Sequence, residues 1–88
     1  MIQVLLAYDI NSDERRDAFR EALEREDWKL VQKSLYSREF ENEESVKEVS
    51  SQIKKLKESQ FFGKYDDVRL FEINHHWYPV EREKIRFF

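Results

Sequence analysis

IQVLLAYDI, residues 2–10, is almost continuously apolar until Asp9, and the polar pair Asn11-Ser12 follows it. A short apolar run that ends at turn-forming residues is typical of a strand buried on both faces of a sheet. We therefore expect a central strand at residues 2–10. Its carboxyl end would carry the Asp9 carboxylate, with a polar turn directly behind it.

Two later segments have the spacing of amphipathic helices. Residues 13–26 follow a capping residue, Asn11 or Ser12, and carry apolar side chains about one helical turn apart. Residues 42–58 place their apolar side chains at steps of three, four and three, with charged residues at most other positions. The apolar positions are Phe19, Ala22 and Leu23 in the first segment and Val46, Val49, Ile53 and Leu56 in the second.

The segment between these helices, residues 28–40, is rich in β-branched and aromatic residues. This composition favours extended structure, either as one long bent strand or as two short strands joined near Lys33-Ser34. After the second helix, Gly63 is the residue able to take a left-handed turn freely, and residues 68–73 resume a strand pattern. The order β-α-β-β-α-β predicts an α+β, ferredoxin-like fold, in which one antiparallel sheet carries both helices on one face.

The last part of the chain follows neither a helix nor a strand pattern clearly. Pro79 interrupts it, which divides the sequence into a ferredoxin-like domain at residues 1–78 and a C-terminal tail at residues 79–88. The tail is too apolar for an ordinary frayed terminus, so we expect it to dock on a partner subunit. Its apolar residues are Val80, Ile85, Phe87 and Phe88.

Composition limits the kinds of protein that fit this sequence. With 88 residues, no Cys, one Gly and one Pro, the chain has room for one small domain, and dimerisation is the obvious support for so small a core. A single glycine makes no phosphate-binding loop, so nucleotide cofactors are not expected. No apolar run approaches the roughly 20 residues that cross a bilayer, and no basic segment or cleavage-like site precedes the first strand. We expect a soluble cytoplasmic protein with no membrane partner.

Asp9 is the first candidate for chemistry, because a carboxylate at the end of a buried strand suits Mg²⁺ or Mn²⁺. One carboxylate makes a poor metal site. A two-fold axis that brought two copies of Asp9 together would supply enough negative charge to hold a divalent ion. The alternative interpretation is that Asp9 only ends a strand and caps a turn. The sequence lacks the motifs of thiol, zinc-peptidase and serine-hydrolase chemistry.

Positive charge offers a second candidate site, because a chain with a formal charge of −3 can bind phosphate only through a confined patch. Arg15 and Arg16 stand near the N-terminus of the first predicted helix, where cations oppose the helix dipole. Together with Lys33 and Arg38 they are the predicted nucleic-acid contacts. Ion pairing with neighbouring carboxylates is the alternative. A further candidate basic patch comprises Lys54, Lys55, Lys57, Lys64 and Arg69.

Four short stretches occur in a specific order and spacing: AYDI at residues 7–10, Arg15-Arg16, VQKSLY at residues 31–36 and DVRLF at residues 67–71. Together they resemble the family of small CRISPR-associated adaptation proteins, which are dimeric ferredoxin-like nucleases or adaptors that partner the spacer integrase. The resemblance implies that Asp9 faces its twin across a dimer axis and binds Mg²⁺ there. It also implies that Arg15 and Arg16 lie near nucleic acid or the dimer interface.

The second half of the chain is also similar to another family. FFGK at residues 61–64, DVRLFEI at residues 67–73 and Trp77 resemble the virulence-associated protein D family, toxin-like ribonucleases that also have an aspartate after the first strand. The short first half favours the adaptation protein. Our leading hypothesis is therefore a homodimer that hydrolyses or binds nucleic acid, DNA or RNA, with paired Asp9 carboxylates on Mg²⁺ or Mn²⁺. The alternatives are a toxin endoribonuclease and a non-catalytic protein-interaction module.

Overall fold

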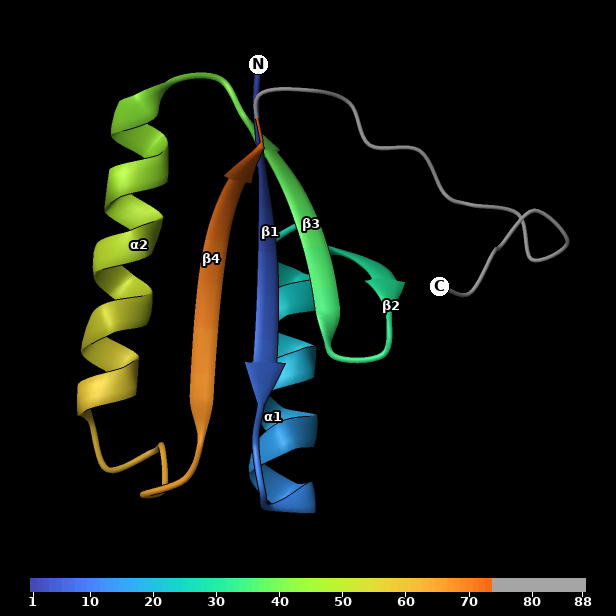
Figure 1. Cartoon of the computed structure of the whole chain (residues 1–88), viewed down its shortest axis with the longest axis vertical. Helices are drawn as coiled ribbons and strands as arrows, with labels where there is room; N and C mark the ends of the chain where they lie inside the picture. Colours follow the sequence, from blue (N-terminus) through green and yellow to red (C-terminus); the bar gives the residue numbers. More distant parts are fainter. Residues whose placement is uncertain (74–88) are drawn as a thin grey trace, which may run out of the picture.

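Strands and helices alternate in the order predicted from the sequence. The structure is a computed structural model that describes residues 1–73, and the predicted docking of the tail at residues 79–88 lies outside that part of the chain (Figure 1). The elements are β1 (Ile2–Asp9), α1 (Asp13–Arg25), β2 (Lys29–Gln32), β3 (Leu35–Phe40), α2 (Glu43–Glu58) and β4 (Asp67–Ile73). Within the described residues no helix is long and apolar enough to cross a membrane.

The four strands form one antiparallel sheet in the order β2-β3-β1-β4. Both helices cover the same face of this sheet, and the other face carries no helix (Figure 1). This arrangement confirms the predicted ferredoxin-like α+β fold. The face without helices is called the open face below.

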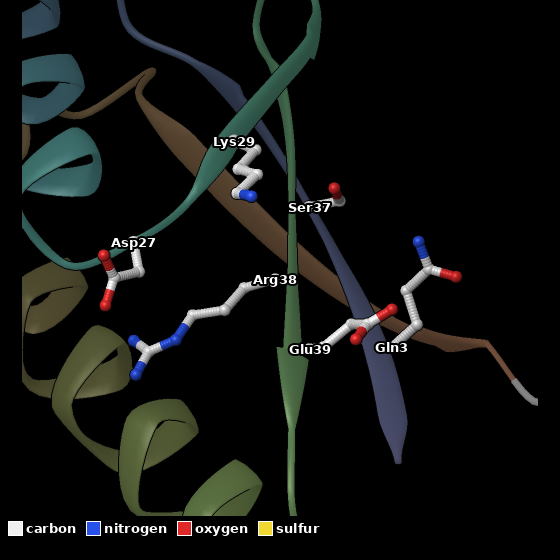
Figure 2. Close-up of a pocket in the computed structure, with 6 residues that line it drawn as sticks. All are labelled: Gln3, Asp27, Lys29, Ser37, Arg38 and Glu39. Atoms are coloured by element: carbon white, nitrogen blue, oxygen red, sulfur yellow. The ribbon is translucent and has the colours of Figure 1, made fainter.

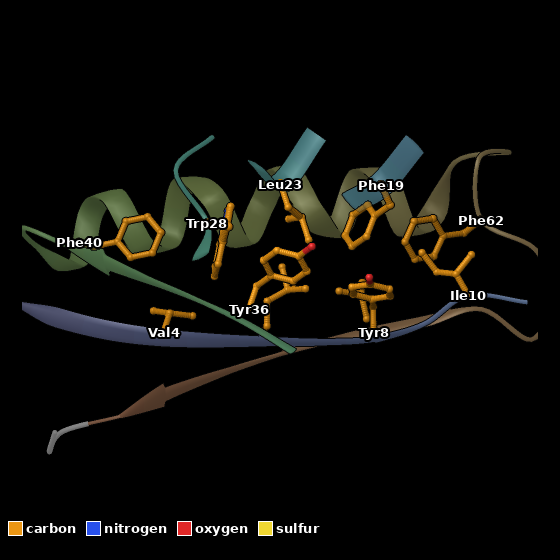
Figure 3. Packing of buried hydrophobic residues seen from close by; sticks show 11 residues of the cluster. Val4, Tyr8, Ile10, Phe19, Leu23, Trp28, Tyr36, Phe40 and Phe62 are labelled. Carbon is orange, nitrogen blue, oxygen red and sulfur yellow. The ribbon is translucent and has the colours of Figure 1, made fainter. Parts of the chain in front are cut away.

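The core fills the space between the sheet and the two helices (Figure 3). On β1, Val4, Leu6 and Tyr8 point into it and are buried. The Tyr8 ring packs edge-on against Phe19 of α1, with ring centroids 5.3 Å apart, and stacks on Tyr36 of β3 at 6.2 Å. The buried apolar residues are Val4, Leu6, Tyr8, Ile10, Phe19, Leu23, Trp28, Tyr36, Phe40, Phe62 and Val68.

One prediction for β1 is wrong in this single chain. The strand was expected to be buried on both faces, but burial alternates along it, and Leu5 and Ala7 on the open face are only half-buried. The reason is that side chains of a strand point alternately to opposite faces and the helices cover only one of them. The near-continuous apolar run therefore places apolar side chains on a face that nothing in the chain's described part covers.

The segment at residues 28–40 is two strands, which settles the alternative left open by its composition. β2 and β3 form a hairpin whose turn, Lys33-Ser34, includes a left-handed residue, Ser34, with φ of 66°. The backbone N–H of Tyr8 donates a hydrogen bond to the Ser34 carbonyl at 3.1 Å. The turn therefore lies beside the carboxyl end of β1, next to Asp9.

Gly63 does not take the left-handed conformation expected of it, since the described positive-φ residues are Asp27 and Ser34. Its lack of a side chain matters for a different reason. A Cβ atom at Gly63 would lie 2.8 Å from Nη2 of Arg15. The glycine leaves room for the Arg15 guanidinium beside the backbone, and the backbone here does not turn to the left.

Candidate functional site

Asp9 lies at the carboxyl end of β1, directly opposite Asp67 in the β1–β4 pairing. Because Val4, Leu6 and Tyr8 face the core, strand alternation places Asp9 on the open face. A shallow cavity of about 160 Å³ lies here, lined by Ala7, Tyr8, Asp9, Asp67 and Arg69. Asp9 is exposed, and it has no hydrogen-bond or ion-pair partner among the described side chains.

Asp67, unlike Asp9, is held by two cations. Its Oδ1 lies 2.6 Å from Lys57 Nζ, and its Oδ2 accepts a hydrogen bond from Arg69 Nε at 3.0 Å. Hydrogen bonds from Lys57 and Arg69 lower the pKa of Asp67 to about 2. Asp67 is therefore ionised and already paired at neutral pH, which leaves Asp9 as the free carboxylate of the two.

The donors around Asp9 set a limit on metal binding. Within residues 1–73 no three His, Cys, Asp or Glu side chains come together in a group that could hold a metal ion. Mg²⁺ keeps several waters and takes one or two carboxylates. One free Asp9 per chain fits such an ion when a second copy supplies the other carboxylate, and the assignment of Asp9 as metal ligand and catalytic residue stays a prediction.

The carboxylate of Asp66, which the sequence analysis did not single out, ties the two strands together at this end of the sheet. Its Oδ1 accepts a hydrogen bond from the Asn11 backbone N–H at 2.8 Å, and its Oδ2 accepts one from the Gly63 N–H at 2.8 Å. Arg15 donates from Nε at 3.0 Å and from Nη2 at 2.7 Å. These contacts, led by the Asn11 and Gly63 bonds, lower the pKa of Asp66 to about 2.

This cluster positions the candidate site. The side-chain amide of Asn11 also donates to the Tyr65 carbonyl at 3.0 Å. The turn after β1 is thus fastened to the residues just before β4, directly beyond the Asp9–Asp67 pair at this end of the sheet. Asn11 and Asp66 therefore hold the backbone of this turn in place, while Asp9 and Asp67 remain on the open face.

The two arginines predicted to contact nucleic acid have partners inside the chain. Arg15 makes the two hydrogen bonds to Asp66 and keeps about a third of its side chain exposed. Arg16 pairs with Asp13 one turn away and donates to the Ile10 carbonyl at 3.4 Å. Both arginines are therefore paired with carboxylates in this structure, as the alternative interpretation of the sequence expected. Their contact with nucleic acid stays a prediction.

Lys33 and Arg38 lie in different places. Lys33 is exposed in the turn between β2 and β3, at the same end of the sheet as Asp9. Arg38 is paired with Val4, which places it near the other end and on the helix side. Its guanidinium carbon lies 4.6 Å from the Phe40 ring centroid, and Nη1 lies 3.9 Å from Glu26. The structure does not bring the four predicted cations together.

Arg38 borders the larger pocket at the edge of β3, about 520 Å³ in volume (Figure 2). Its Nη1 is buried and has no hydrogen-bond partner among the described residues. Arg38 and Asp27 extend to the helix side of the strand, whereas Ser37 and Gln3 extend to the other side (Figure 2). The lining carries both signs of charge and consists of Gln3, Asp27, Lys29, Ser37, Arg38 and Glu39.

Comparison with known proteins adds independent information. The model of the family described as "CRISPR associated protein Cas2" matches residues 1–79. Thirteen solved chains match, among them one described as "Crystal structure of cas2", with 16% sequence identity, 99% of this chain and 97% of that chain covered, and a TM-score of 0.59. No curated protein sequence matches. The structural likeness supports the fold, and the family model supports the first of the two families that the sequence resembles.

Proposed function

Since the chain belongs to the Cas2 family and is a CRISPR-associated adaptation protein, we propose that it acts on nucleic acid as a homodimer with a metal-dependent phosphodiester site at Asp9. The observation that carries this proposal is the contrast between two opposed carboxylates. Asp67 is paired with Lys57 and Arg69, and Asp9 is exposed and unpaired among the described residues. An exposed, unpaired carboxylate beside a cavity is available for a ligand.

The chemistry expected of the site follows from the negative charge that develops on a phosphodiester during hydrolysis. When bound, a divalent ion would lower the pKa of a water molecule and stabilise the charge that develops on the phosphodiester. Asp9 would hold that ion together with the Asp9 of a second copy. Asp66 would keep Asp9 at its position by fixing the turn that begins at Asn11.

The open face supports the second part of the proposal, the homodimer. Its centre is apolar, with Phe71 about half exposed, and its rim carries charges of both signs. Its apolar side chains are Leu5, Ala7, Leu35, Phe71 and Ile73. A second copy placed over this face by a two-fold axis would cover these side chains and bring the two Asp9 carboxylates toward each other. An integrase is the further partner that we propose for the dimer.

A cleavage assay tests the metal-dependent site. Labelled single-stranded and double-stranded DNA and RNA are incubated with the protein and Mg²⁺, Mn²⁺ or EDTA. We expect cleavage with a divalent ion, none with EDTA, and loss of cleavage in Asp9→Asn. Asp17→Asn is the control, because Asp17 is an exposed carboxylate on α1 whose contact with Arg20 is long, at 3.6 Å.

The same experiment separates an enzyme from an adaptor. Binding without cleavage under every divalent ion, with Asp9→Asn binding like the wild type, would show an adaptor that holds nucleic acid for an integrase. A protein that binds neither DNA nor RNA would contradict both forms of the proposal. That result would favour a protein-interaction module.

A further inference from the structure

We propose that Arg69 is a phosphate-binding residue, which holds one phosphate of a nucleic-acid backbone in the cavity beside Asp9. This inference rests on the proposed function, because it deepens the site at Asp9. It assigns a ligand to a residue that the sequence analysis placed only in a broad basic patch. Three observations carry it: the position of Arg69, the orientation of its guanidinium and the charge around Asp67.

The position follows from the sheet register. Arg69 is paired with Ala7, and Asp67 is paired with Asp9, so Arg69 and Asp9 are diagonal neighbours on the open face. Diagonal neighbours across an antiparallel pair lie about 7–8 Å apart, within reach of a long side chain. Both residues line the same cavity of about 160 Å³. A phosphate in that cavity would contact Arg69 while its neighbouring bond lies near Asp9.

The orientation follows from a single hydrogen bond. Arg69 donates to Asp67 through Nε only, and its terminal nitrogens have no hydrogen-bond partner among the described residues. Its side chain is 73% exposed. Fixing Nε against a carboxylate holds the planar guanidinium in place, and the two terminal amino groups are the ones that bind phosphate in a bidentate manner. Arg15 differs, because both Nε and Nη2 are used by Asp66.

The positive charge of Arg69 is not needed to neutralise Asp67. Lys57, at 2.6 Å, already neutralises Asp67, whose pKa is lowered to about 2. Arg69 is therefore the second cation on one ionised carboxylate. The cluster of Lys57, Asp67 and Arg69 carries one net positive charge at the edge of the cavity. The free Asp9 carboxylate lines the same cavity and brings the sum of the four charges to zero, so a phosphate would be held by donation from Arg69, the one cation in the lining, and not by an overall positive charge.

The test measures binding and does not depend on catalysis. An oligonucleotide that the wild-type protein binds is labelled, and its binding is followed by fluorescence anisotropy in EDTA over a range of salt concentrations. A series of oligonucleotides carries one neutral methylphosphonate linkage at successive positions. The wild type should bind one member of the series markedly less tightly than the rest, because that member lacks the phosphate that contacts Arg69.

Arg69→Ala should weaken binding of the unmodified oligonucleotide about tenfold or more. It should reduce the magnitude of the slope of log K against log salt by roughly one, which corresponds to one phosphate contact fewer. It should also bind all members of the neutral-linkage series alike. Arg69→Lys should restore the salt slope but only part of the affinity, because an ammonium lacks the bidentate geometry. Lys47→Ala, which removes one exposed lysine of α2 outside the candidate basic patch, is the matched control and should keep the discrimination against the neutral linkage.

The inference is overturned if Arg69→Ala keeps the wild-type affinity and salt slope, or if Lys47→Ala and Arg69→Ala behave alike. Either result leaves the proposed function standing, provided that Asp9→Asn still abolishes cleavage. A wild-type protein that binds no nucleic acid would overturn both. Circular dichroism of each variant verifies that it is folded before its binding is compared.

Discussion

Asp9 and Asp67 stand directly opposite each other across the β1–β4 pair, and only Asp67 is neutralised by neighbouring cations. Like charges placed directly opposite on one face of a sheet destabilise the pairing. Lys57 reaches Asp67 from α2 and Arg69 reaches it from the same strand, which offsets that repulsion from one side. The arrangement keeps a second carboxylate exposed at the cavity without a partner of its own.

We predict that acid weakens the fold through Asp66 and Asp67. Their pKa values are lowered to about 2 in the folded chain, by hydrogen bonds from Asn11 and Gly63 and from Lys57 and Arg69 respectively. A carboxyl whose folded pKa lies below its unfolded value stabilises the fold above the unfolded pKa, and this stabilisation is lost as the pH falls through the folded one. The free energy of unfolding in urea should therefore fall between about pH 5 and pH 2.

Variants assign this pH dependence to the two residues. Asp66→Asn and Asp67→Asn should each be less stable at pH 7 and less sensitive to acid than the wild type. Asp17→Asn should keep the wild-type pH profile. Equal profiles for all four proteins would mean that neither carboxylate is linked to folding.

We predict that Arg15→Ala lowers the stability of the protein more than Arg16→Ala. Arg15 supplies two of the five hydrogen bonds to a buried carboxylate, so its removal leaves part of Asp66 without donors. Arg16 pairs with Asp13, which is almost fully exposed, and such surface pairs contribute about 0–1 kcal/mol. Urea midpoints at pH 7 measure the difference. Arg15→Ala could instead keep the wild-type urea midpoint and weaken nucleic-acid binding. That result would show that Arg15 serves nucleic-acid binding, as predicted from the sequence, and not the stability of the Asp66 cluster.

We predict that Gly63→Ala is costly only while Arg15 is present. The added Cβ would lie 2.8 Å from Arg15 Nη2 and would push the guanidinium away from Asp66. In a double-mutant cycle, Gly63→Ala should destabilise the wild type and have little effect in the Arg15→Ala background. A coupling of about 0.5 kcal/mol or more is the expected size for residues in contact. Additive effects would show that Gly63 is required for another reason.

We predict that the two faces of β1 and its neighbours respond differently to substitution. Leu6 is fully buried in the core, so Leu6→Ala should cost about 2–5 kcal/mol of unfolding free energy. Phe71 lies on the open face, where Phe71→Glu should leave the chain folded and halve the mass measured by light scattering. Leu30→Glu is the control, because Leu30 is also exposed but lies on β2 at the edge. A Phe71→Glu variant with the wild-type mass would contradict the proposed dimer interface.

Local patterns predicted most of the fold. The helices expected at residues 13–26 and 42–58 are Asp13–Arg25 and Glu43–Glu58, because apolar spacing and the capping residues Ser12 and Asn42 act within one or two turns. The strand expected at residues 68–73 begins one residue earlier. Element order then selected the topology, since the rules for short connections and their handedness leave few arrangements of these six elements.

The contacts of the site were less predictable. Arg15 and Asp66 are 51 residues apart, and no periodicity connects them, so Arg15 was grouped with the cations that bind phosphate. The same limit applies to Arg38, whose side of the sheet follows from its pairing with Val4 of β1, a residue far away in the sequence. Asp9 could be selected because a carboxylate directly behind an apolar strand is a local signal. Its contrast with Asp67 emerged only from the paired strands.

The bond from Asn11 to Asp66 joins residues separated by 55 positions, and this separation has a consequence for the order of folding. Contacts so distant in sequence form late, because the intervening chain must first lose the entropy of a long loop. A chain that has formed β1, α1 and the β2–β3 hairpin but has not yet docked β4 already carries Asp9. It lacks the hydrogen bond from Asn11 to Asp66 that fixes the turn behind Asp9, and it lacks the strand β4 that supplies Arg69. An unfinished molecule, such as one still being synthesised, would therefore be inert toward nucleic acid at this site until its last described strand is in place.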